Sequence, residues 1–268
     1  MRFMLLASLP AACAQLNSTY LSGCTTPPCR KLLCLHGGGQ SRQSFQLALD
    51  PLAAELGDTY ELVFVSGPYG TDNAPVWIRD PPGGKASPTT DSNWDQQSLE
   101  LLDGVVQEHG PFYGIVGYSQ GTAETVSYLS HAPGSFELVV AFCAYVPTTH
   151  KGIAQRVASA SPFAVPAFVY MSKNDWIINN CMTNDFASRF SYVTRYTDSE
   201  GGHTPAAFEE AADFIKANHQ DGSYVYPKAT ADELPGAACP TSSTDKTEAL
   251  IYTVAGVGAI GLAYTAVT

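Results

Sequence analysis

The sequence is short of basic residues. Its 268 residues include 14 Lys and Arg against 25 Asp and Glu, which gives a formal net charge of −11 at pH 7. A protein that binds nucleic acid neutralises phosphate groups with clustered Lys and Arg, and this sequence contains no basic run. We therefore expect no nucleic-acid partner, and we interpret the acidity as that of a soluble surface whose charges repel one another.

Signatures of metal-binding and nucleotide-binding loops are also lacking. None of the seven cysteines belongs to a CxxC pair followed by histidines at zinc-binding spacing, so a zinc site is not expected. The glycine run that begins at Gly37 is followed by neither Gly-Lys-Ser nor a G-x-G-x-x-G pattern, which argues against a phosphate-binding loop. We expect that the protein needs neither a metal ion nor an organic cofactor.

The cysteines indicate two kinds of environment. Cys34 and Cys143 lie within apolar, strand-like runs, where a buried free thiol is the expected state. Cys24 and Cys29 are close enough in sequence to form a local disulfide in an oxidising compartment. The pairing of the other cysteines does not follow from their spacing.

The first residues have the layout of a secretory signal. Residues 1–14 contain one Arg, a short apolar run and the A-x-A cleavage sequence Ala12-Cys13-Ala14. Cleavage there would place a glycosylation sequence that begins at Asn17 near the new terminus. The alternative is an N-terminal segment that is kept, or a start codon placed upstream of the true one. In either case residues 15–30 are expected to be an extension of the folded domain.

The last residues resemble an attachment signal. Residues 249–268 carry no charge and are long enough to span a bilayer, although their glycines and threonines make them weakly hydrophobic. Small residues at 236–238 and a polar spacer precede them, as in a GPI-attachment signal, while a membrane anchor and a helix packed on the domain are the alternatives. Residues 223–248 are expected to be a linker. Together the two ends predict secretion or membrane attachment through the secretory pathway.

Between these ends, residues 31–222 are expected to form one α/β domain. Apolar runs typical of buried strands alternate with segments whose apolar residues recur at helical spacing. This alternation predicts a mostly parallel sheet with helices on both faces, and fully apolar strands fit because such a sheet is buried on both sides. The expected strands are 31–36, 61–68, 112–117, 137–146, 166–172 and 191–196, and the expected helices are 41–56, 92–110, 121–132 and 205–219.

A long loop at residues 68–92 is dense in Pro and Gly. Long ordered loops in compact domains often serve as lids or as walls of a binding site. Tyr69 and Trp77, together with the nearby Trp94, are candidates for the lining of an apolar substrate pocket. The alternative is a surface excursion that places one aromatic side chain in the core.

The most specific motif is Gly117-Tyr118-Ser119-Gln120-Gly121, which lies between an expected strand and an expected helix. It fits the G-x-S-x-G pattern of a nucleophile elbow in the context that this motif requires. Glycines flank the serine because close neighbours in so tight a turn must lack a Cβ atom. The turn exposes the Ser119 hydroxyl and places the Gln120 N–H at a helix N-terminus, where it can stabilise an oxyanion.

Two residues can complete a catalytic triad with Ser119. A serine hydroxyl becomes a nucleophile when a base takes its proton, and in α/β-hydrolases the acid and then the base follow the serine along the chain. His203 lies in a loop before the last expected helix and is the candidate base. Asp175 directly follows an expected strand and is the candidate acid, with turn formation as its alternative role. Asp198 is the rival acid, but it lies too near His203 in sequence.

The loop after the first core strand is expected to supply a second oxyanion donor. It reads His36-Gly37-Gly38-Gly39-Gln40, and glycines let the backbone approach a substrate and turn an N–H inward. Gly38 is the expected donor, and Gly39 is the alternative.

With these residues identified, the sequence resembles the fungal-type serine hydrolase family, the relatives of the ovarian cancer-associated gene 2 product. The resemblance rests on KLLCLHGGGQSRQSF, WIRD, GPFYGIVGYSQGTA and GGHTPA, and it covers residues 31–219. Members of this family are small α/β-hydrolases with little or no cap that act on carboxylic esters and sometimes on acyl thioesters. The resemblance implies Ser119 as nucleophile, Asp175 as acid and His203 as base. It also implies a cytoplasmic location, as an alternative to the secretory one that the two ends predict.

We therefore expect a serine hydrolase that cleaves carboxylic esters, or thioesters, of small or acyl-chain substrates through an acyl-enzyme. A cutinase-like or acyl-protein-thioesterase-like hydrolase on the same fold is the nearest alternative, because GYSQG or GFSQG also occurs in those proteins. A ligand-binding protein that keeps the fold without the chemistry is the alternative from another class. The oligomeric state does not follow from the sequence.

Overall fold

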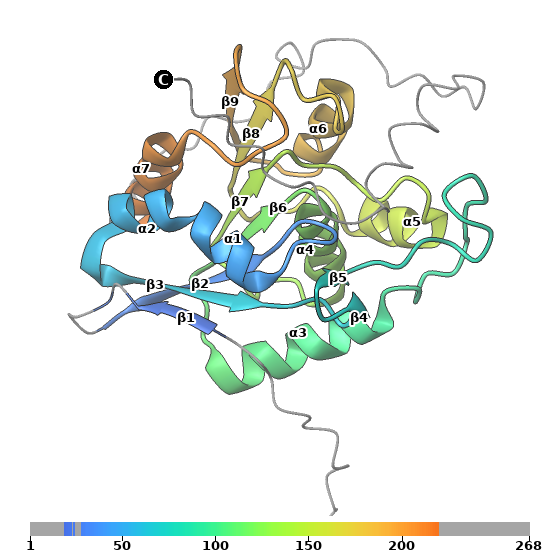
Figure 1. The fold of residues 1–268 in the computed structure, drawn as a ribbon, viewed down its shortest axis with the longest axis horizontal. Helices are drawn as coiled ribbons and strands as arrows, with labels where there is room; N and C mark the ends of the chain where they lie inside the picture. Colours follow the sequence, from blue (N-terminus) through green and yellow to red (C-terminus); the bar gives the residue numbers. More distant parts are fainter. Residues whose placement is uncertain (1–18, 23, 25–27, 220–268) are drawn as a thin grey trace, which may run out of the picture.

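The computed structural model of the protein describes residues 19–22, 24 and 28–219 (Figure 1). The signal peptide expected at residues 1–14, and the linker and tail expected from residue 223 onward, lie outside the described residues. Among the helices of the described part, none is both long enough and apolar enough to cross a membrane.

The centre of the fold is a seven-stranded sheet (Figure 1). Its strands are β1 (Thr19–Ser22), β2 (Arg30–Leu35), β3 (Tyr60–Val65), β6 (Gly114–Tyr118), β7 (Leu138–Phe142), β8 (Ala167–Ser172) and β9 (Val193–Asp198). They lie in the order β1-β3-β2-β6-β7-β8-β9, and each neighbouring pair runs parallel except β1 and β3. The carboxyl ends of six strands therefore meet at one edge of the sheet, where ligands of such sheets bind.

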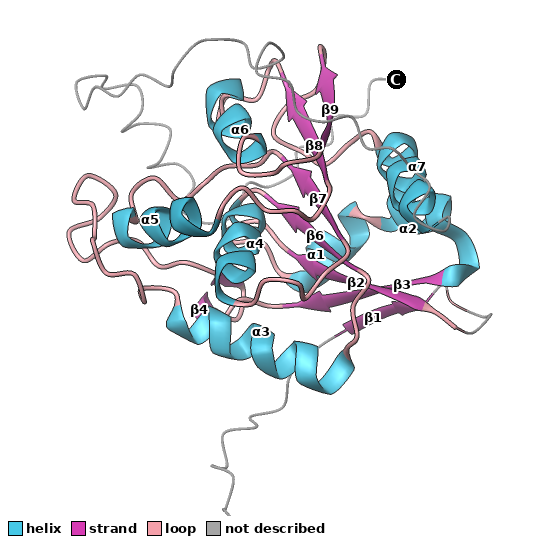
Figure 2. Cartoon of the chain, turned by 180° about the vertical axis from the view of Figure 1, so that it is seen from behind, coloured by secondary structure: helices cyan, strands magenta, loops and turns pink. Residues whose placement is uncertain are grey.

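Helices cover both faces of this sheet, as the two opposite views in Figure 1 and Figure 2 show. Because successive residues of a strand point to opposite faces, Leu33 and Leu35 of β2 belong to one apolar cluster, and Leu32 and Cys34 belong to the other. The first cluster includes residues of α3 (Gln96–His109), α4 (Gln120–His131), α5 (Lys151–Ala160) and α6 (Asn180–Ala187). The second includes residues of α1 (Arg42–Ala48), α2 (Asp50–Leu56) and α7 (Phe208–His219). The expected fold class is confirmed.

The first expected helix, residues 41–56, is divided in the structure. Ser41 caps α1, because its side chain accepts a hydrogen bond from the Ser44 N–H at 3.2 Å. Leu49 ends α1, and α2 begins directly after it with Pro51 in its first turn. Proline has no N–H for the preceding turn, but it is well suited to the first turn of a new helix. The helices α5 and α6 and the edge strand β1 are further elements that the sequence patterns did not predict.

The long connection between β3 and α3 covers residues 66–95, all of which the structure describes. It contains a two-stranded sheet, β4 (Tyr69–Thr71) and β5 (Ala74–Val76), and no helix. The segment that was expected to form a loop thus includes a short hairpin. Its contacts with the rest of the domain bear directly on the candidate site.

The described cysteines include both expected environments. Cys24 and Cys29 form a disulfide, as their spacing predicted. Cys34 and Cys143 are free and buried, also as predicted. Cys34 lies in β2, whereas Cys143 directly follows β7 and lies at the edge of the sheet that carries the site.

Candidate active site

Ser119 lies in the turn between β6 and α4, with φ 50° and ψ −117°. A positive φ is uncommon for a residue with a Cβ atom and indicates a turn that its surroundings hold in place. The neighbouring glycines are needed because the backbone segments approach closely. A Cβ atom at Gly121 would lie 2.1 Å from the Leu35 carbonyl oxygen, and one at Gly117 would lie 3.0 Å from the Gly121 carbonyl oxygen. The local structure is therefore the sharp elbow that the G-x-S-x-G pattern predicted.

The structure brings Ser119, His203 and Asp175 together. Ser119 Oγ lies 3.0 Å from His203 Nε2, and His203 Nδ1 lies 2.8 Å from Asp175 Oδ2. The side chains of His203 and Asp175 are only 10% and 1% exposed, so their pairing is shielded from water. The three residues follow β6, β8 and β9 and meet at the carboxyl edge of the sheet. They form one continuous hydrogen-bonded chain.

Backbone groups hold the carboxylate of Asp175 in its orientation. Its second oxygen, Oδ1, accepts hydrogen bonds from the N–H groups of Ile177 at 2.9 Å and Ile178 at 2.8 Å. Asp175 therefore also forms a turn, which was its alternative role, while the same side chain contacts His203. One oxygen fixes the turn, and this leaves the other directed at the imidazole.

The loop that carries His203 is anchored on two sides. The Tyr118 hydroxyl donates a hydrogen bond of 2.7 Å to the His203 carbonyl oxygen, and the two rings lie with their centroids 5.2 Å apart. Asp198 accepts hydrogen bonds from the Glu200 and Gly201 N–H groups at 2.8 and 2.9 Å. These backbone hydrogen bonds lower the pKa of the Asp198 carboxyl from its ordinary value. Asp198, the rival acid, therefore stabilises the start of this loop through backbone hydrogen bonds, whereas Asp175 is the carboxylate that contacts the imidazole.

The two expected oxyanion donors lie on neighbouring segments. Gln120 is the first residue of α4, and a helix N-terminus leaves such N–H groups without an acceptor inside the helix. In the loop after β2, the Gly39 N–H donates to the Pro75 carbonyl oxygen at 2.9 Å. The Gly38 N–H meets no acceptor among the described residues. Of the two alternatives left open by the sequence, Gly38 is thus the one whose N–H is available.

A hydrogen-bonded network that the sequence did not reveal holds this loop. The buried His36 accepts the Gly67 N–H at Nε2, 3.0 Å away, so its Nδ1 carries the proton and donates to the Gly37 carbonyl oxygen at 2.7 Å. Burial lowers the pKa of His36 to about 4, which keeps the ring neutral at pH 7. Trp77 Nε1 donates to the His36 carbonyl oxygen at 2.9 Å, and Gln120 Oε1 accepts the Trp77 N–H at 2.8 Å. A histidine directly after an apolar strand was the only signal of this network.

Of the three aromatic residues expected to line a substrate pocket, Trp77 has other surroundings, whereas for Tyr69 and Trp94 that role stays a prediction. Trp77 is completely buried, its ring packs against His36, and it has no surface that a substrate could touch. This corrects the expectation for Trp77, which instead positions Gln120 and the loop after β2. The guanidinium group of Arg79 lies 4.5 Å from the ring centroid of Tyr69 and 4.7 Å from that of Trp94. Tyr69 and Trp94 are therefore packed around Arg79.

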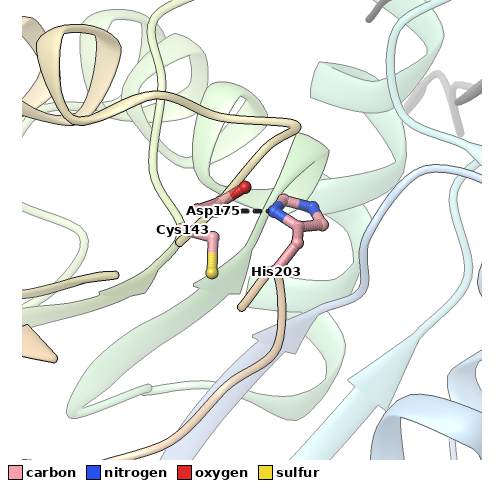
Figure 3. Close-up of side chains that lie close together, drawn as sticks. All are labelled: Cys143, Asp175 and His203. Carbon is pink, nitrogen blue, oxygen red and sulfur yellow. Dashed lines mark hydrogen bonds and ion pairs between the residues drawn. The ribbon is translucent and has the colours of Figure 1, made fainter. Parts of the chain in front are cut away.

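Cys143 lies beside the Ser–His–Asp chain. It has φ 52°, so like Ser119 it is a residue with a Cβ atom in the left-handed region. Its sulfur, a carboxylate oxygen of Asp175 and a ring nitrogen of His203 lie within 4.8 Å of one another (Figure 3). Burial, and then the charge of Asp175, raise the pKa of the Cys143 thiol well above its ordinary value. The sulfur thus keeps its proton and is not activated as a second nucleophile.

The sequence is similar to known hydrolases and esterases. The family model described as Serine hydrolase (FSH1) matches residues 25–211. Esterase FUS5 of Gibberella moniliformis is 30% identical over 112 residues, which cover 37% of this chain and 47% of the relative. Esterase OVCA2 of Mus musculus is 26% identical over 218 residues, which cover 69% of this chain and 94% of the relative. The chain thus spans less than half of the first relative and nearly all of the second.

A solved structure shows the same architecture. Acyl-protein thioesterase 2 of Zea mays superposes with a TM-score of 0.57 and 16% sequence identity, over 75% of this chain and 98% of that protein. At this identity the likeness concerns the fold, which is that of the α/β-hydrolases. The order of the strands and the place of the elbow agree with this class.

Proposed function

The chain belongs to the serine hydrolase (FSH1) family, and from this premise we propose that it hydrolyses carboxylic esters through an acyl-enzyme formed on Ser119. The observation that carries the proposal is the chain of hydrogen bonds from Ser119 through His203 to Asp175. Similarity to two proteins named esterases supports an ester as the substrate class. Acyl transfer of this kind needs only side chains and backbone amides.

In the first step, Ser119 Oγ attacks the ester carbonyl carbon while its proton passes to His203 Nε2, which lies 3.0 Å away. The contact between His203 Nδ1 and Asp175 Oδ2 keeps the other ring proton on Nδ1, so that Nε2 presents a lone pair to the serine. The Asp175 carboxylate stabilises the imidazolium that forms. Because Ile177 and Ile178 hold its other oxygen, the carboxylate needs no reorientation during the reaction.

The tetrahedral intermediate carries an oxyanion, and the N–H groups of Gln120 and Gly38 are the proposed donors to it. The amide of Gln120 benefits from the positive end of the α4 dipole. The network of His36, Trp77 and the Gln120 side chain holds the two segments together before substrate binds. Such preorganisation stabilises developing charge without reorganisation during the reaction.

The intermediate collapses when His203 returns its proton to the leaving alcohol, which departs and leaves the acyl group on Ser119. A water molecule then takes the place of the alcohol, with His203 again as the base. Hydrolysis of the acyl-enzyme, which is an ester of Ser119, releases the carboxylic acid and restores the serine. The same steps would cleave an acyl thioester, and the fold shared with a thioesterase makes that the second substrate class to test.

The direct test is the Ser119→Ala variant on p-nitrophenyl esters of increasing acyl length. We expect hydrolysis to fall by a factor of about 10⁴ or more, because no nucleophile remains. Ser159→Ala on the exposed end of α5 is a matched control and should keep the wild-type rate. Undiminished turnover by Ser119→Ala would reject the assignment.

The acyl-length profile also separates the alternatives. Preference for insoluble polyester over short soluble esters would favour a cutinase-like activity, and preference for acyl thioesters over matched oxygen esters would favour a thioesterase. If a fluorophosphonate probe failed to label Ser119 at all, the chain would be a binding protein that retains the fold. The proposal expects labelling and turnover of soluble oxygen esters.

A further inference from the structure

Three side chains that bind metals well converge at the carboxyl edge of the sheet. Cys143 follows β7, Asp175 follows β8, and His203 lies in the loop after β9, so neighbouring strands deliver all three to one place. A sulfur, an oxygen and a nitrogen atom are thereby held within 4.8 Å of one another (Figure 3). His203 Nδ1, which lies 2.8 Å from Asp175 Oδ2, is the ring nitrogen on that side.

We propose that Cys143, Asp175 and His203 form an inhibitory site for a zinc ion, which blocks hydrolysis by engaging two members of the triad. Zn²⁺ accepts thiolate, imidazole and carboxylate ligands together, and sites with three protein ligands complete their coordination with a water molecule. The thiolate ligand favours Zn²⁺ over Mg²⁺ and Ca²⁺, which prefer oxygen ligands.

The geometry needs only a small adjustment to hold the ion. With bond lengths of about 2.0 to 2.3 Å, the ligand atoms of a tetrahedral zinc site lie about 3.3 to 3.8 Å apart. The three atoms now span separations from 2.8 Å, between His203 and Asp175, up to at most 4.8 Å. A movement of about 1 Å, within the range of side-chain rotation, would therefore form the site.

The backbone at Cys143 supports a role beyond core packing. The described residues with a Cβ atom and a positive φ are Ser119, Cys143 and Ala207, and the first is the candidate nucleophile. Unusual dihedral angles of this kind persist where the surroundings enforce them, and they cluster at functional sites. At Cys143 the N–H donates to the Tyr170 carbonyl oxygen at 3.1 Å, and the thiol faces the Thr204 carbonyl oxygen at 3.7 Å.

Charge balance also suits a buried ion. The Asp175 carboxylate and the Cys143 thiolate together cancel the two positive charges of Zn²⁺, while His203 binds as a neutral ring. Binding breaks the S–H bond, and that proton leaves to solvent as the zinc–sulfur bond forms. A neutral site can occupy this shielded position without the large desolvation cost of an unpaired charge.

Inhibition follows from the position of the imidazole proton. When Nδ1 donates its lone pair to zinc, the single ring proton must move to Nε2, the atom that faces Ser119. His203 then has no lone pair with which to accept the serine proton, and Asp175 is engaged by the metal. The ion would switch off the base without entering the space between Ser119 and the substrate carbonyl.

The kinetic test, which rests on the proposed ester hydrolysis, uses untagged protein and compares Cys143→Ala with Cys34→Ala. Among the described residues Cys34 is the other buried free thiol, and it lies within β2. Hydrolysis is measured with increasing ZnCl₂, each variant is compared with its own metal-free rate, and activity is restored with EDTA. We expect Cys143→Ala to need at least about tenfold more zinc for half-inhibition, because one of three protein ligands is lost. Cys34→Ala should match the wild type.

A spectroscopic test does not depend on turnover. Co²⁺ substitutes for Zn²⁺, and a cobalt–thiolate bond gives a near-ultraviolet charge-transfer band. The band should appear with CoCl₂ in the wild type and in the inactive Ser119→Ala variant, and it should be lost in Cys143→Ala. Circular dichroism checks folding, and Cys143→Ser serves in place of the alanine variant if that one does not fold.

Each outcome decides the proposal. It is overturned if zinc leaves the wild type active, if Cys143→Ala is as sensitive as the wild type, or if Co²⁺ gives no thiolate band. If the protein hydrolyses no ester but the cobalt band appears and depends on Cys143, the metal site stands and the proposed function is what fails.

Discussion

The Tyr118 hydroxyl donates a 2.7 Å hydrogen bond to the backbone carbonyl oxygen of His203. The residue directly before the candidate nucleophile thus holds the loop that carries the candidate base. The same ring fills the space beside Gly37, where a Cβ atom would lie 2.9 Å from it. Tyr118 therefore connects the elbow, the loop after β2 and the His203 loop.

Tyr118→Phe tests this positioning role, because it removes the hydroxyl and keeps the ring. We expect kcat to fall about tenfold, which corresponds to roughly 1.4 kcal/mol for one hydrogen bond that holds the base in place. KM should change little, since the hydroxyl bonds the protein backbone. Steady-state kinetics on a p-nitrophenyl ester measures both constants. Tyr60→Phe, at the opposite end of the strands, is the control and should leave kcat unchanged; an equal loss in both variants would contradict the positioning role.

Gly121→Ala tests the close packing behind the elbow. A Cβ atom there would lie 2.1 Å from the Leu35 carbonyl oxygen, so the elbow or β2 must move. We expect the free energy of unfolding to fall by at least about 2 kcal/mol. Hydrolysis should also be lost, because overpacking shifts the backbone that bears Ser119. Urea denaturation followed by circular dichroism gives the change. At Gly202 a Cβ atom would meet no atom within 4 Å, so Gly202→Ala should unfold at nearly the wild-type urea concentration.

The buried carboxyl group of Glu124 should make the stability of the protein depend on pH. Its side chain is buried in α4, and both carboxyl oxygens lack a hydrogen-bond partner among the described residues. Burial, and then the charge of Asp95, raise the pKa of Glu124 well above its ordinary value of 4.5. Above pH 4.5 the folded protein therefore keeps a proton that the unfolded chain releases. This group makes the folded state less stable as pH rises from that value.

Glu124→Gln removes the titration while it keeps the shape of the side chain. We expect the variant to melt at least about 2 °C above the wild type at pH 8, with the difference shrinking toward pH 4. Thermal unfolding across this pH range makes the measurement. Glu55→Gln on the exposed face of α2 is the matched control and should melt with the wild type throughout. A Glu124→Gln variant that is less stable at pH 8 would show that the carboxylate is paired rather than isolated.

The parts of the fold that depend on local patterns could be predicted from the sequence. Apolar runs bounded by turn residues identified the parallel strands, and the glycines around Ser119 identified the elbow because their spacing reflects one tight turn. The division of the first helix also has a local signal, Pro51. The apolar residues keep helical spacing across this proline, however, so the pattern concealed the break. Helices α5 and α6 are short and follow irregular segments, so their apolar residues were too few to establish a period.

Contacts between distant segments could not be predicted in this way. The place of Cys143 beside Asp175 and His203 depends on β7 lying next to β8 and β8 next to β9, which no spacing along the chain reveals. The same is true of the hydrogen bonds that join Trp77, His36 and Gln120. Trp77 was expected to face a substrate because long ordered loops often form the wall of a binding site, whereas here its indole is part of the core.

Reaction of the protein with a fluorophosphonate, followed by peptide mass spectrometry, tests most directly whether Ser119 is the activated nucleophile. We predict that the wild type forms one adduct, located on Ser119, and that Ser119→Ala forms none. His203→Ala should form the adduct at least about a thousandfold more slowly, since the base is then lost. Labelling of Ser119 at the same rate without His203, or no adduct on Ser119 in the folded wild type, would contradict this prediction.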